Sequence, residues 1–522
     1  MSRQIAKNAQ CFRVKIMRLR SIGKARTRDM PTLDVEQAVR QPLETEPLSP
    51  VKRPWWRSLV LLLLLLLALA FYIVLINVAP PLVTALILPF LQVWMLCFVP
   101  YFAACGFVLL TKPASGPWRW IELGIILVGA LLFRVMVLPL PPNLSHDSWR
   151  YLWDARVTLH GYSPYVYAPS DKAFLSLHDF IYENSRYRDV PTIYPPGAQA
   201  VYVLSYLLAP GNLFFLKGIF IVFDMVTCGA LALLLLQRGL DPRRIIIYAW
   251  SPLPIVEFAI QGHVDAITVT FTVLAMLFAT CSWRGSRAVT GFLIGMATLT
   301  KIYPIFLLIV IMRRRDWALL TTCLATIMVG YFPFVILGHG QVLGYFSGYS
   351  SEQGGNAGVV QLVTYWISQA HGFSLTTTVM QQHVVDVVVI CGMSLAVLAL
   401  RIFKVSMEAT TLLLLATIFA ISSHVFPWYT PVLLPWVAIL IGPLWTREGI
   451  SGRGLAILIV WYFTTVSIYG YLFNGPQDWH VYYWSVYDVV MAGLGIALLI
   501  GLRGWLKHMY NLHRLTMEGK AK

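Results

Sequence analysis

The sequence predicts an all-α, polytopic membrane protein, and three observations predict this class. Of the 522 residues, 58% are hydrophobic and only 12% are charged, about half the charged fraction of a soluble protein. Apolar stretches of roughly 20 residues, the length that crosses a bilayer as a helix, recur along most of the chain. They are continuous, as in residues 61–70, and do not alternate as the strands of a membrane β-barrel do. A water-soluble enzyme, a secreted disulfide scaffold and a disordered regulator are therefore excluded.

The apolar stretches define about 12 transmembrane helices. In chain order they cover residues 58–78, 84–110, 119–140, 213–236, 245–260, 264–282, 317–338, 385–402, 409–425, 428–445, 453–473 and 485–503. Two further apolar pieces, 194–210 and 288–311, are expected to be re-entrant or broken helices. The first contains two consecutive prolines and the second contains Lys301 and Pro304, which are residues that such a break requires.

The positive charge of the chain predicts its orientation. The net charge of +16 comes from 40 Lys and Arg against 24 Asp and Glu, and it lies mainly at the ends of apolar spans. Thirteen Lys or Arg residues occur in the first 57 residues, and five occur from Arg503 onward. By the positive-inside rule, both tails and the short basic loops are expected in the cytoplasm. The chain carries no recognisable nucleic-acid-binding module, so nucleic acid is not an expected partner.

The chain is expected to have four parts. They are a basic cytoplasmic tail (1–57), two N-terminal spans (58–118), a larger transmembrane domain (119–503) and a second cytoplasmic tail (504–522). The larger domain carries a large first extracytoplasmic loop at about 141–193 and a second one at about 339–384. Large polar loops on one face, with short basic turns on the other, place the functional site at the outer membrane surface.

The first large loop begins with the segment from His146 to Arg156. If this segment is helical, Asp147, Arg150, Tyr151 and Asp154 share one face at spacings of three, four and seven residues. A carboxylate there can act as general base toward a hydroxyl, while an adjacent Arg keeps it ionised. The pattern also fits a juxtamembrane amphipathic helix with interfacial aromatic rings and intrahelical ion pairs.

An outer turn between two spans carries Glu257, His263 and Asp265. Ionisable groups at that depth are costly unless they face a cavity or a partner, so all three are functional candidates. His263 and Asp265 are residue types that bind metals, but two residues do not define a metal site. A divalent cation is one interpretation of this pair, and a helix-capping pair is the other.

Lys301 lies inside an apolar stretch and is a candidate for binding an anion. A cation in a broken membrane helix can hold the phosphate of a lipid-linked substrate and stabilise charge on a leaving phosphate. The alternative is a lysine whose ammonium reaches the membrane surface. Residues 313–315 are three arginines that already supply the interfacial charge, which favours the functional interpretation.

Two other polar residues in apolar surroundings are candidates. His424 precedes an outer turn, where it can contact a phosphate or a sugar hydroxyl, or simply lie at the interface. Arg134 is a cation late in the third span, close in sequence to Asp147, and is expected to pair with it.

Seven short motifs occur in a defined order along the chain. They are Asp147-Ser-Trp-Arg-Tyr-Leu-Trp-Asp154, Gly161-Tyr-Ser-Pro-Tyr165, Tyr194-Pro-Pro196, Trp250-Ser-Pro252, Gly262-His-Val-Asp265, Lys301-Ile-Tyr-Pro304 and Pro427-Trp-Tyr429. This ordered series, within about 119–480, resembles the polytopic polyprenol-phosphate-mannose-dependent mannosyltransferases and their relatives in the GT-C glycosyltransferase superfamily.

The resemblance implies a multi-span, inverting glycosyltransferase of a bacterial inner or plasma membrane. It implies transfer of a hexose, mannose in the first instance, from a polyprenyl-phosphate donor to a glycolipid, glycan or other envelope acceptor on the extracytoplasmic face. It implies that Asp147 is the base or the acceptor-positioning group, that Asp154 is the second acidic candidate, and that Lys301 holds the donor phosphate. The candidate substrate-binding residues around them are Arg150, Tyr151, His263, Asp265, Tyr303 and His424.

Two other functions use the same features. A secondary transporter would use the intramembrane charges as substrate or coupling groups, although no internal repeat is visible in the sequence. A polymerase or ligase of lipid-linked glycans would share the outer site but join preassembled chains. The sequence contains no Walker motif and no dinucleotide glycine fingerprint, so an activated sugar is expected to reach the protein in another form.

Overall fold

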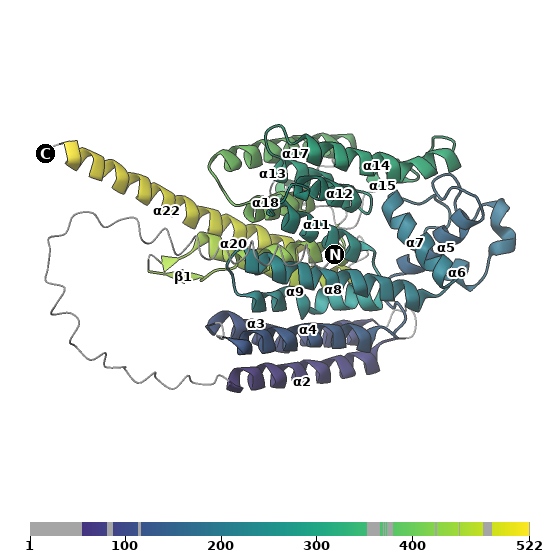
Figure 1. The fold of residues 1–522 in the computed structure, drawn as a ribbon, viewed down its shortest axis with the longest axis horizontal. Coiled ribbons are helices and arrows are strands. Elements are labelled where there is room, and N and C mark those ends of the chain that lie inside the picture. Colours follow the sequence, from purple (N-terminus) through teal and green to yellow (C-terminus); the bar gives the residue numbers. More distant parts are fainter. Residues whose placement is uncertain are drawn as a thin grey trace, which may run out of the picture. The chain divides into compact units, whose positions relative to one another are not determined.

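The computed structural model describes residues 55–80, 87–112, 116–351, 366–368, 370, 372, 379–422, 425–447, 449–472 and 483–520. The N-terminal tail up to residue 54, part of the expected second loop and His424 lie outside the described residues. Within them the protein is mostly helical, with a single two-stranded hairpin (Figure 1), which confirms the all-α prediction.

Eight helices in the described ranges are long and apolar enough to cross a membrane, as expected for a multi-pass membrane protein. They are α2 (Trp55–Val78), α3 (Leu88–Leu110), α4 (Pro117–Val137), α8 (Leu213–Gln237), α14 (Trp317–Leu337), α17 (Val379–Ile402), α20 (Gly452–Val466) with the 3-10 turn η7 (Ser467–Tyr471), and α22 (Val489–Lys520) with the π-helical turn η8 (Tyr483–Asp488).

Shorter elements connect these helices. They are α5 (Asp147–Leu159), η2 (Lys172–Leu177), α6 (Phe180–Asn184), α7 (Pro196–Leu208), η3 (Pro242–Ile245), α9 (Ile246–Ala249), α10 (Pro252–Pro254), η4 (Ile255–Ile260), α11 (Asp265–Ala279), α12 (Ser286–Thr298), η5 (Tyr303–Phe306), α13 (Leu307–Ile311), α15 (Phe346–Ser351), α18 (Met407–Ile421), η6 (Pro427–Leu433) and α19 (Leu434–Leu440). A small hairpin pairs β1 (Trp445–Thr446) with β2 (Gly449–Ile450) in antiparallel register.

Eight of the twelve expected spans correspond to the eight long helices. The other four, expected at 245–260, 264–282, 409–425 and 428–445, are shorter or interrupted helices. The expected break around Lys301 is confirmed, because α12 ends before it and the chain resumes as η5 and α13.

Prolines interrupt the segment 245–260 because they have no backbone N–H group to donate. Protein surrounds the segment on all sides. Every residue from 245 to 260 is buried. Side chains of distant helices donate to its freed carbonyls: Tyr101 donates to Ile247 at 2.7 Å and Trp94 donates to Pro252 at 3.1 Å. A broken backbone is tolerated at membrane depth only where protein satisfies it in this way.

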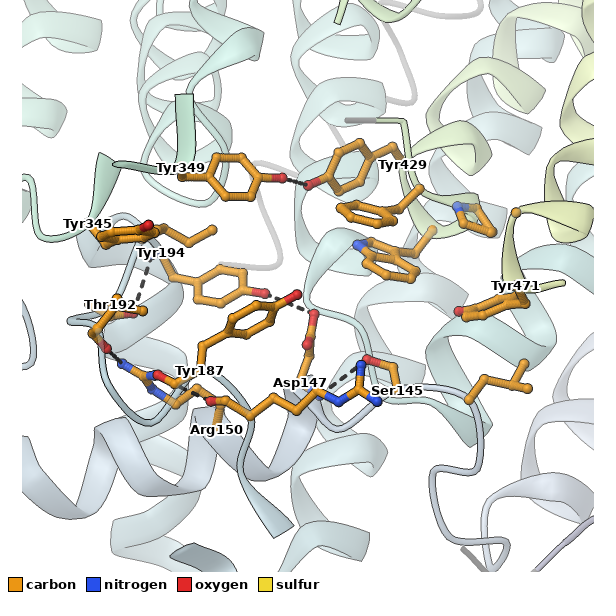
Figure 2. Close-up of a pocket in the computed structure, with 18 of the residues that line it drawn as sticks. Ser145, Asp147, Arg150, Tyr187, Thr192, Tyr194, Tyr345, Tyr349, Tyr429 and Tyr471 are labelled. Carbon is orange, nitrogen blue, oxygen red and sulfur yellow. Dashed lines mark hydrogen bonds between the residues drawn. The ribbon is translucent and has the colours of Figure 1, made fainter. Parts of the chain in front are cut away.

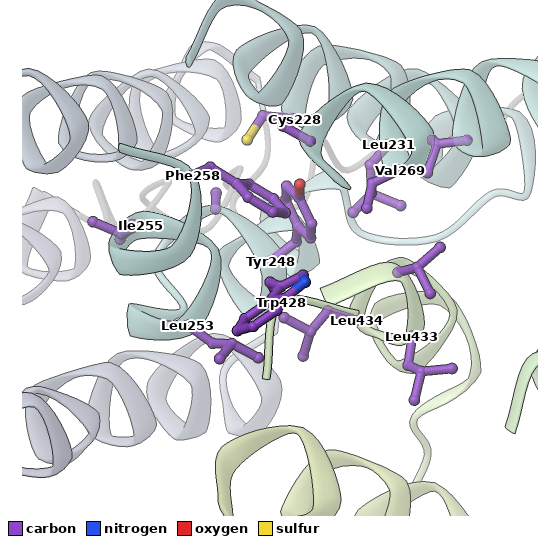
Figure 3. Close-up of a cluster of buried hydrophobic side chains, with 14 of the residues drawn as sticks. Cys228, Leu231, Tyr248, Leu253, Ile255, Phe258, Val269, Trp428, Leu433 and Leu434 are labelled. Atoms are coloured by element: carbon purple, nitrogen blue, oxygen red, sulfur yellow. The ribbon is translucent and has the colours of Figure 1, made fainter. Parts of the chain in front are cut away.

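The hydrophobic core packs around this interrupted segment (Figure 3). Phe258 and Leu253 from the segment contact the core together with Cys228 of α8 and Trp428 of η6. All four side chains are at most 8% exposed. The core therefore joins the N-terminal half of the domain to η6, which is about 170 residues further along the chain by the numbering.

Among the described residues, two ion pairs between an arginine and a carboxylate are completely buried. The Arg134 guanidinium contacts the Asp224 carboxylate at 2.6 Å, and Arg243 contacts Glu122 at 2.6 Å. Tyr248 also donates to Asp224 at 2.5 Å. The expectation that Arg134 pairs with the candidate base is therefore wrong, because a carboxylate on α8 lies against it at the same depth.

Helices α12 and α14 approach each other very closely. A Cβ atom on Gly291 would lie 2.1 Å from the carbonyl oxygen of Leu319, so no larger residue fits there without a shift. Thr322 of α14 donates to the carbonyl of Ala288 at 2.9 Å across the same contact. Small residues that allow such backbone approach are typical of helix pairs in membranes.

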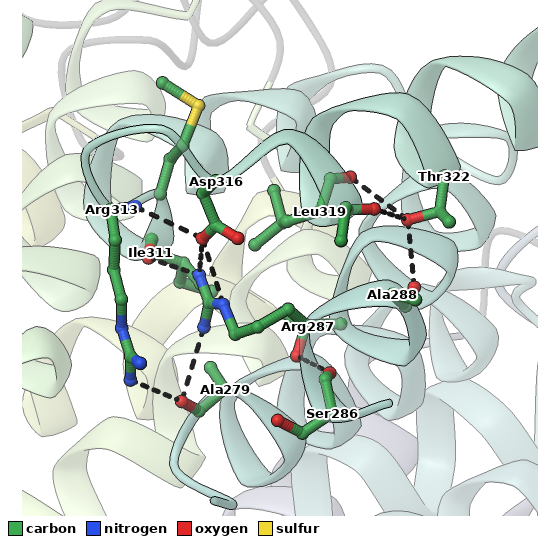
Figure 4. A network of polar contacts seen from close by, with 12 residues as sticks. Ala279, Ser286, Arg287, Ala288, Ile311, Arg313, Asp316, Leu319 and Thr322 are labelled. Atoms are coloured by element: carbon green, nitrogen blue, oxygen red, sulfur yellow. Dashed lines mark hydrogen bonds and ion pairs between the residues drawn. The ribbon is translucent and has the colours of Figure 1, made fainter. Parts of the chain in front are cut away.

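Near this contact, arginine side chains form hydrogen bonds with groups at the ends of helices (Figure 4). Arg287 contacts Asp316 through its Nε atom at 2.9 Å and donates to the carbonyl of Ile311, the last residue of α13, at 3.0 Å. The backbone N–H of Arg313 donates to Asp316 at 3.2 Å. The network holds the C-terminal end of α13 beside the start of α14 and supports the segment that carries Lys301.

Candidate active site

A cavity of about 420 Å³ opens between the polar segment 141–193 and η6 (Figure 2). Its lining combines one carboxylate, two guanidinium groups and many aromatic rings. The lining residues are Leu144, Ser145, Asp147, Arg150, Arg186, Tyr187, Val190, Pro191, Thr192, Ile193, Tyr194, Tyr345, Tyr349, Phe426, Pro427, Trp428, Tyr429, Gly470 and Tyr471. Aromatic rings and polar groups in one concave site suit a sugar ring that carries an apolar or a charged group.

Asp147 is the first residue of α5 and its carboxylate faces this cavity. Tyr194 donates its hydroxyl to the Asp147 carboxylate at 3.2 Å, and the Asp147 backbone N–H donates to the Ser145 hydroxyl at 3.2 Å (Figure 2). Tyr151 donates in turn to the Tyr194 hydroxyl at 3.2 Å. The side chain is therefore oriented by a tyrosine while the cavity leaves room for a substrate hydroxyl.

Gln261 holds the backbone that leads into Asp147. Its side-chain oxygen accepts the backbone N–H groups of Asn143, Leu144 and Ser145 at 3.1, 2.9 and 3.3 Å. Its amide nitrogen donates to the Asn143 side-chain oxygen at 2.6 Å. Gln261 is buried in the turn before α11. Its hydrogen bonds to the backbone of residues 143–145 therefore set the position of Asp147 relative to that turn.

Replacing Gln261 with Met is expected to lower kcat by about 10²-fold, because small misplacements of a reacting group are costly. Replacement with Glu is expected to keep most of the activity. The Glu carboxylate still accepts the three N–H groups, and the Asn143 amide, whose nitrogen has no partner among the described residues, can turn to donate to it. Initial rates for the two variants test this role, and equal rates for both would contradict it.

Tyr194 and Lys301 are brought together by a tight backbone contact. The backbone N–H groups of Gly197 and Ala198 donate to the carbonyl of Leu299 at 2.8 and 3.1 Å. A Cβ atom at Gly197 would lie 2.7 Å from the Leu299 side chain, so glycine is required for this approach. The start of α7 therefore rests against the end of α12, two residues before Lys301.

Lys301 lies behind the aromatic wall of the cavity. Its ammonium is 3.5 Å from the Asp265 carboxylate, 4.5 Å from the centre of the Tyr429 ring and 5.4 Å from that of Tyr194. Asp147 and Lys301 thus contact the same tyrosine, one through its hydroxyl and the other over its ring. The structure brings the two candidates to one site, although the Lys301 side chain is not part of the cavity lining.

The buried side chains of His263 and Glu257 support the part of the cavity wall that Trp428 and Tyr471 form. The His263 Nδ1 atom is 2.8 Å from the Glu257 carboxylate, which also accepts the Tyr471 hydroxyl at 3.0 Å. The His263 ring stacks on Trp428 at 4.0 Å. Tyr471 and Trp428 both line the cavity, so His263 and Glu257 act on the cavity through these two rings.

The remaining candidates on α5 take different places. Arg150 lines the cavity, but its guanidinium is bound to the Asp154 carboxylate at 2.7 Å. Asp154 also accepts the Gln199 amide at 3.1 Å and is 1% exposed, so it lies behind the cavity. The Tyr151 ring stacks on Tyr202 at 4.4 Å, with only its hydroxyl directed to Tyr194.

Tyr303 packs edge-on against Phe419 at 5.5 Å and is not part of the cavity lining. The described residues contain no group of three His, Cys, Asp or Glu side chains that could hold a metal ion. Reasoning from the sequence missed Gln261 and Arg186 as members of the site. Gln261 directly precedes the motif that starts at Gly262, and Arg186 lies in the loop before Tyr194. A side-chain amide and a loop arginine carry no signal in a sequence pattern.

Residues 192–427 match the family model of Glycosyltransferase family 87. No curated protein matches the chain. The matched segment includes the cavity residues Tyr194, Tyr345 and Tyr349, the His263 turn and Lys301, whereas Asp147 precedes it. Together with the eight apolar helices, the match supports a membrane glycosyltransferase.

Proposed function

We propose that this protein transfers a hexose, with mannose as the first candidate, from a polyprenyl-phosphate donor to a glycolipid, glycan or other envelope acceptor. The reaction takes place on the extracytoplasmic side of the membrane. The observation that carries the proposal is the single site in which Asp147 and Lys301 flank Tyr194. Asp147 lines the cavity and Lys301 lies behind its aromatic wall, so a base and a cation stand at one site, as a sugar leaving a phosphate requires.

The chemistry is a single displacement at the anomeric carbon. The Asp147 carboxylate takes the proton of the acceptor hydroxyl as the oxygen forms a bond to this carbon. The bond between the anomeric carbon and the phosphate oxygen breaks, and the electron pair leaves with the polyprenyl phosphate. Lys301 stabilises the second negative charge that develops on that phosphate. Because attack and departure occur on opposite faces, the anomeric configuration is inverted.

The electrostatics of Asp147 suit a general base. Burial raises the pKa of its carboxyl group, which makes it a better proton acceptor than an exposed aspartate. The charge of Lys301, hydrogen bonds from Tyr194 and Ser145, and the charge of Arg186 oppose this rise. The neutral side chains of Tyr194 and Ser145 thus orient the Asp147 carboxylate. It also lies near Lys301, the cation that stabilises the leaving phosphate.

The match of residues 192–427 to a glycosyltransferase family favours an enzyme over a secondary transporter. The test uses the purified full chain in proteoliposomes, supplied with polyprenyl-phosphate [¹⁴C]mannose or with GDP-[¹⁴C]mannose and a total lipid extract as acceptor. We expect a labelled product from the lipid-linked donor alone, with inverted anomeric configuration by NMR. Transfer from the nucleotide sugar, or uptake of free sugar without a new glycosidic bond, would overturn the proposal.

A further inference from the structure

Lys217 is a buried lysine that the proposed chemistry does not use. It lies near the start of α8 and is 2% exposed. Its ammonium donates to the carbonyls of Leu138 and Leu140 at 2.7 and 2.5 Å and to that of Ile260 at 3.4 Å. Among the described residues it pairs with no carboxylate. The three N–H groups of the ammonium are therefore matched by three backbone carbonyls.

These carbonyls lie at the ends of two different elements. Leu138 caps the C-terminal end of α4, Leu140 follows it, and Ile260 is the last residue of η4. Carbonyls at the end of a helix lack an intrahelical donor and carry partial negative charge, so a cation is favourable there. Lys217 of α8 thus joins the end of α4 to the end of η4.

Both of these ends lead directly into the site. Residues 138–140 precede the loop that carries Asp147, and the residue after η4 is Gln261, which binds the backbone of residues 143–145. The segment before Asp147 is therefore held at two points, by Gln261 directly and by Lys217 through the carbonyl at the end of η4. Loss of either contact would let Asp147 shift relative to the turn after η4.

The aliphatic part of Lys217 lies against the same turn. A Cβ atom on Gly262 would lie 2.9 Å from the Lys217 Cγ atom and 3.2 Å from the Cβ atom of Ser148, the residue after Asp147. Gly262 also has a φ of +72°, which favours glycine. The lysine side chain, the turn and the start of α5 therefore meet beside Asp147, with no space for a larger residue at position 262.

We propose that Lys217 is a positioning residue for sugar transfer, because its ammonium fixes the backbone that places the Asp147 carboxylate in the cavity. The inference rests on the proposed function, since Lys217 affects the reaction only through the Asp147 base. Lys217 does not line the cavity, so it acts through the backbone and not by contact with a substrate. A displacement of about 1 Å in a reacting group can lower the rate about 10²-fold.

The test combines kinetics with amide hydrogen exchange of the full chain in nanodiscs. Lys217→Met keeps an apolar side chain of similar length and removes the three donors. We expect kcat to fall by about 10²-fold and the donor KM to stay unchanged. Exchange should become faster in peptides that cover residues 143–150 and stay unchanged in α14, because the opening is local. Exchange is measured without substrate, so it reports on the backbone whatever the donor is.

A double-mutant cycle with Asp147→Asn separates positioning from a purely structural role. The double variant Lys217→Met/Asp147→Asn should be as active as Asp147→Asn alone, because no base is left to misplace. A lysine that only stabilises the fold would lower the rate by the same factor in both backgrounds. That result, a wild-type kcat in Lys217→Met, or evenly faster exchange along the chain would overturn the inference. Full activity of Asp147→Asn by itself would contradict the proposed mechanism instead.

Two further variants complete the design. Lys217→Gln keeps two donors and replaces Lys217→Met if the latter does not fold. It should show a smaller loss of kcat that also disappears in the Asp147→Asn background. Arg244→Met is the matched control, because it removes a cation that donates to the carbonyl of Ile441, after α19, at 3.2 Å and does not line the cavity. A loss of kcat in Arg244→Met as large as that in Lys217→Met would overturn the inference.

Discussion

Asp147→Asn is expected to lower kcat for sugar transfer by about 10²- to 10⁴-fold, the range that a general base contributes. The amide cannot take a proton from the acceptor hydroxyl, but it has the same volume and still accepts the hydrogen bond from Tyr194. Folding and donor binding should therefore be retained. Initial rates in nanodiscs, with size-exclusion profiles and thermal melting of the same samples, measure the effect.

The matched control is Asp171→Asn, in the same polar segment but outside the cavity. Asp171 caps η2 by accepting the N–H of Ala173 at 2.9 Å, and an asparagine can cap the turn in the same way. This variant should have wild-type activity. Full activity of Asp147→Asn would remove the mechanism.

The pH dependence of the wild type follows from the same carboxylate. Its raised pKa means that kcat/KM should fall as the pH drops through that pKa, because only the ionised form accepts a proton. The residual activity of Asp147→Asn should lack this acid limb.

Lys301→Met is expected to raise the KM for the lipid-linked donor by about 10- to 100-fold and to leave the acceptor KM unchanged. The variant removes the cation that stabilises the leaving phosphate. It also removes a charge that lowers the pKa of Asp147, so the acid limb of kcat/KM should move to higher pH. Steady-state kinetics with each substrate varied in turn, repeated across a pH series, measure both effects.

Loss of Lys301 also leaves the buried Asp265 without its counter-charge, which is destabilising in a low-dielectric interior. The double variant Lys301→Met/Asp265→Asn removes both charges and should fold better than the single variant. We expect the same donor defect in the double variant. A return of the donor KM to the wild-type value would mean that Lys301 only balances Asp265, and the phosphate role would be wrong.

The site could be anticipated in part because some of its features are local. The start of a helix at Asp147 and the break before Lys301 follow from the order of polar, aromatic and proline residues, and both are present in the structure. The predicted shared face of α5 is divided, however. Seven residues of helix span about 10 Å, so Asp147 reaches the cavity while Asp154 lies two turns away against Gln199.

Other parts of the site depend on partners far apart in the sequence. Gln261 binds the backbone at 143–145, and Gly197 admits the carbonyl of Leu299. Each of these contacts joins two segments whose spacing no local pattern encodes. The same reason explains the error at Arg134, which is near Asp147 in sequence but pairs with Asp224 on another helix.

By itself, the sequence determined that the protein is a bundle of membrane helices with a few costly charges inside it, because hydropathy and charge are properties of single segments. Only the tertiary structure decided which of these charges lie at one site and which are neutralised by a partner. That choice depends on the packing of broken helices around residues 245–260, where distant side chains satisfy the backbone. A buried charge is destabilising unless a partner group lies next to it. Because that partner comes from a distant segment, the pairing is a property of the assembled bundle.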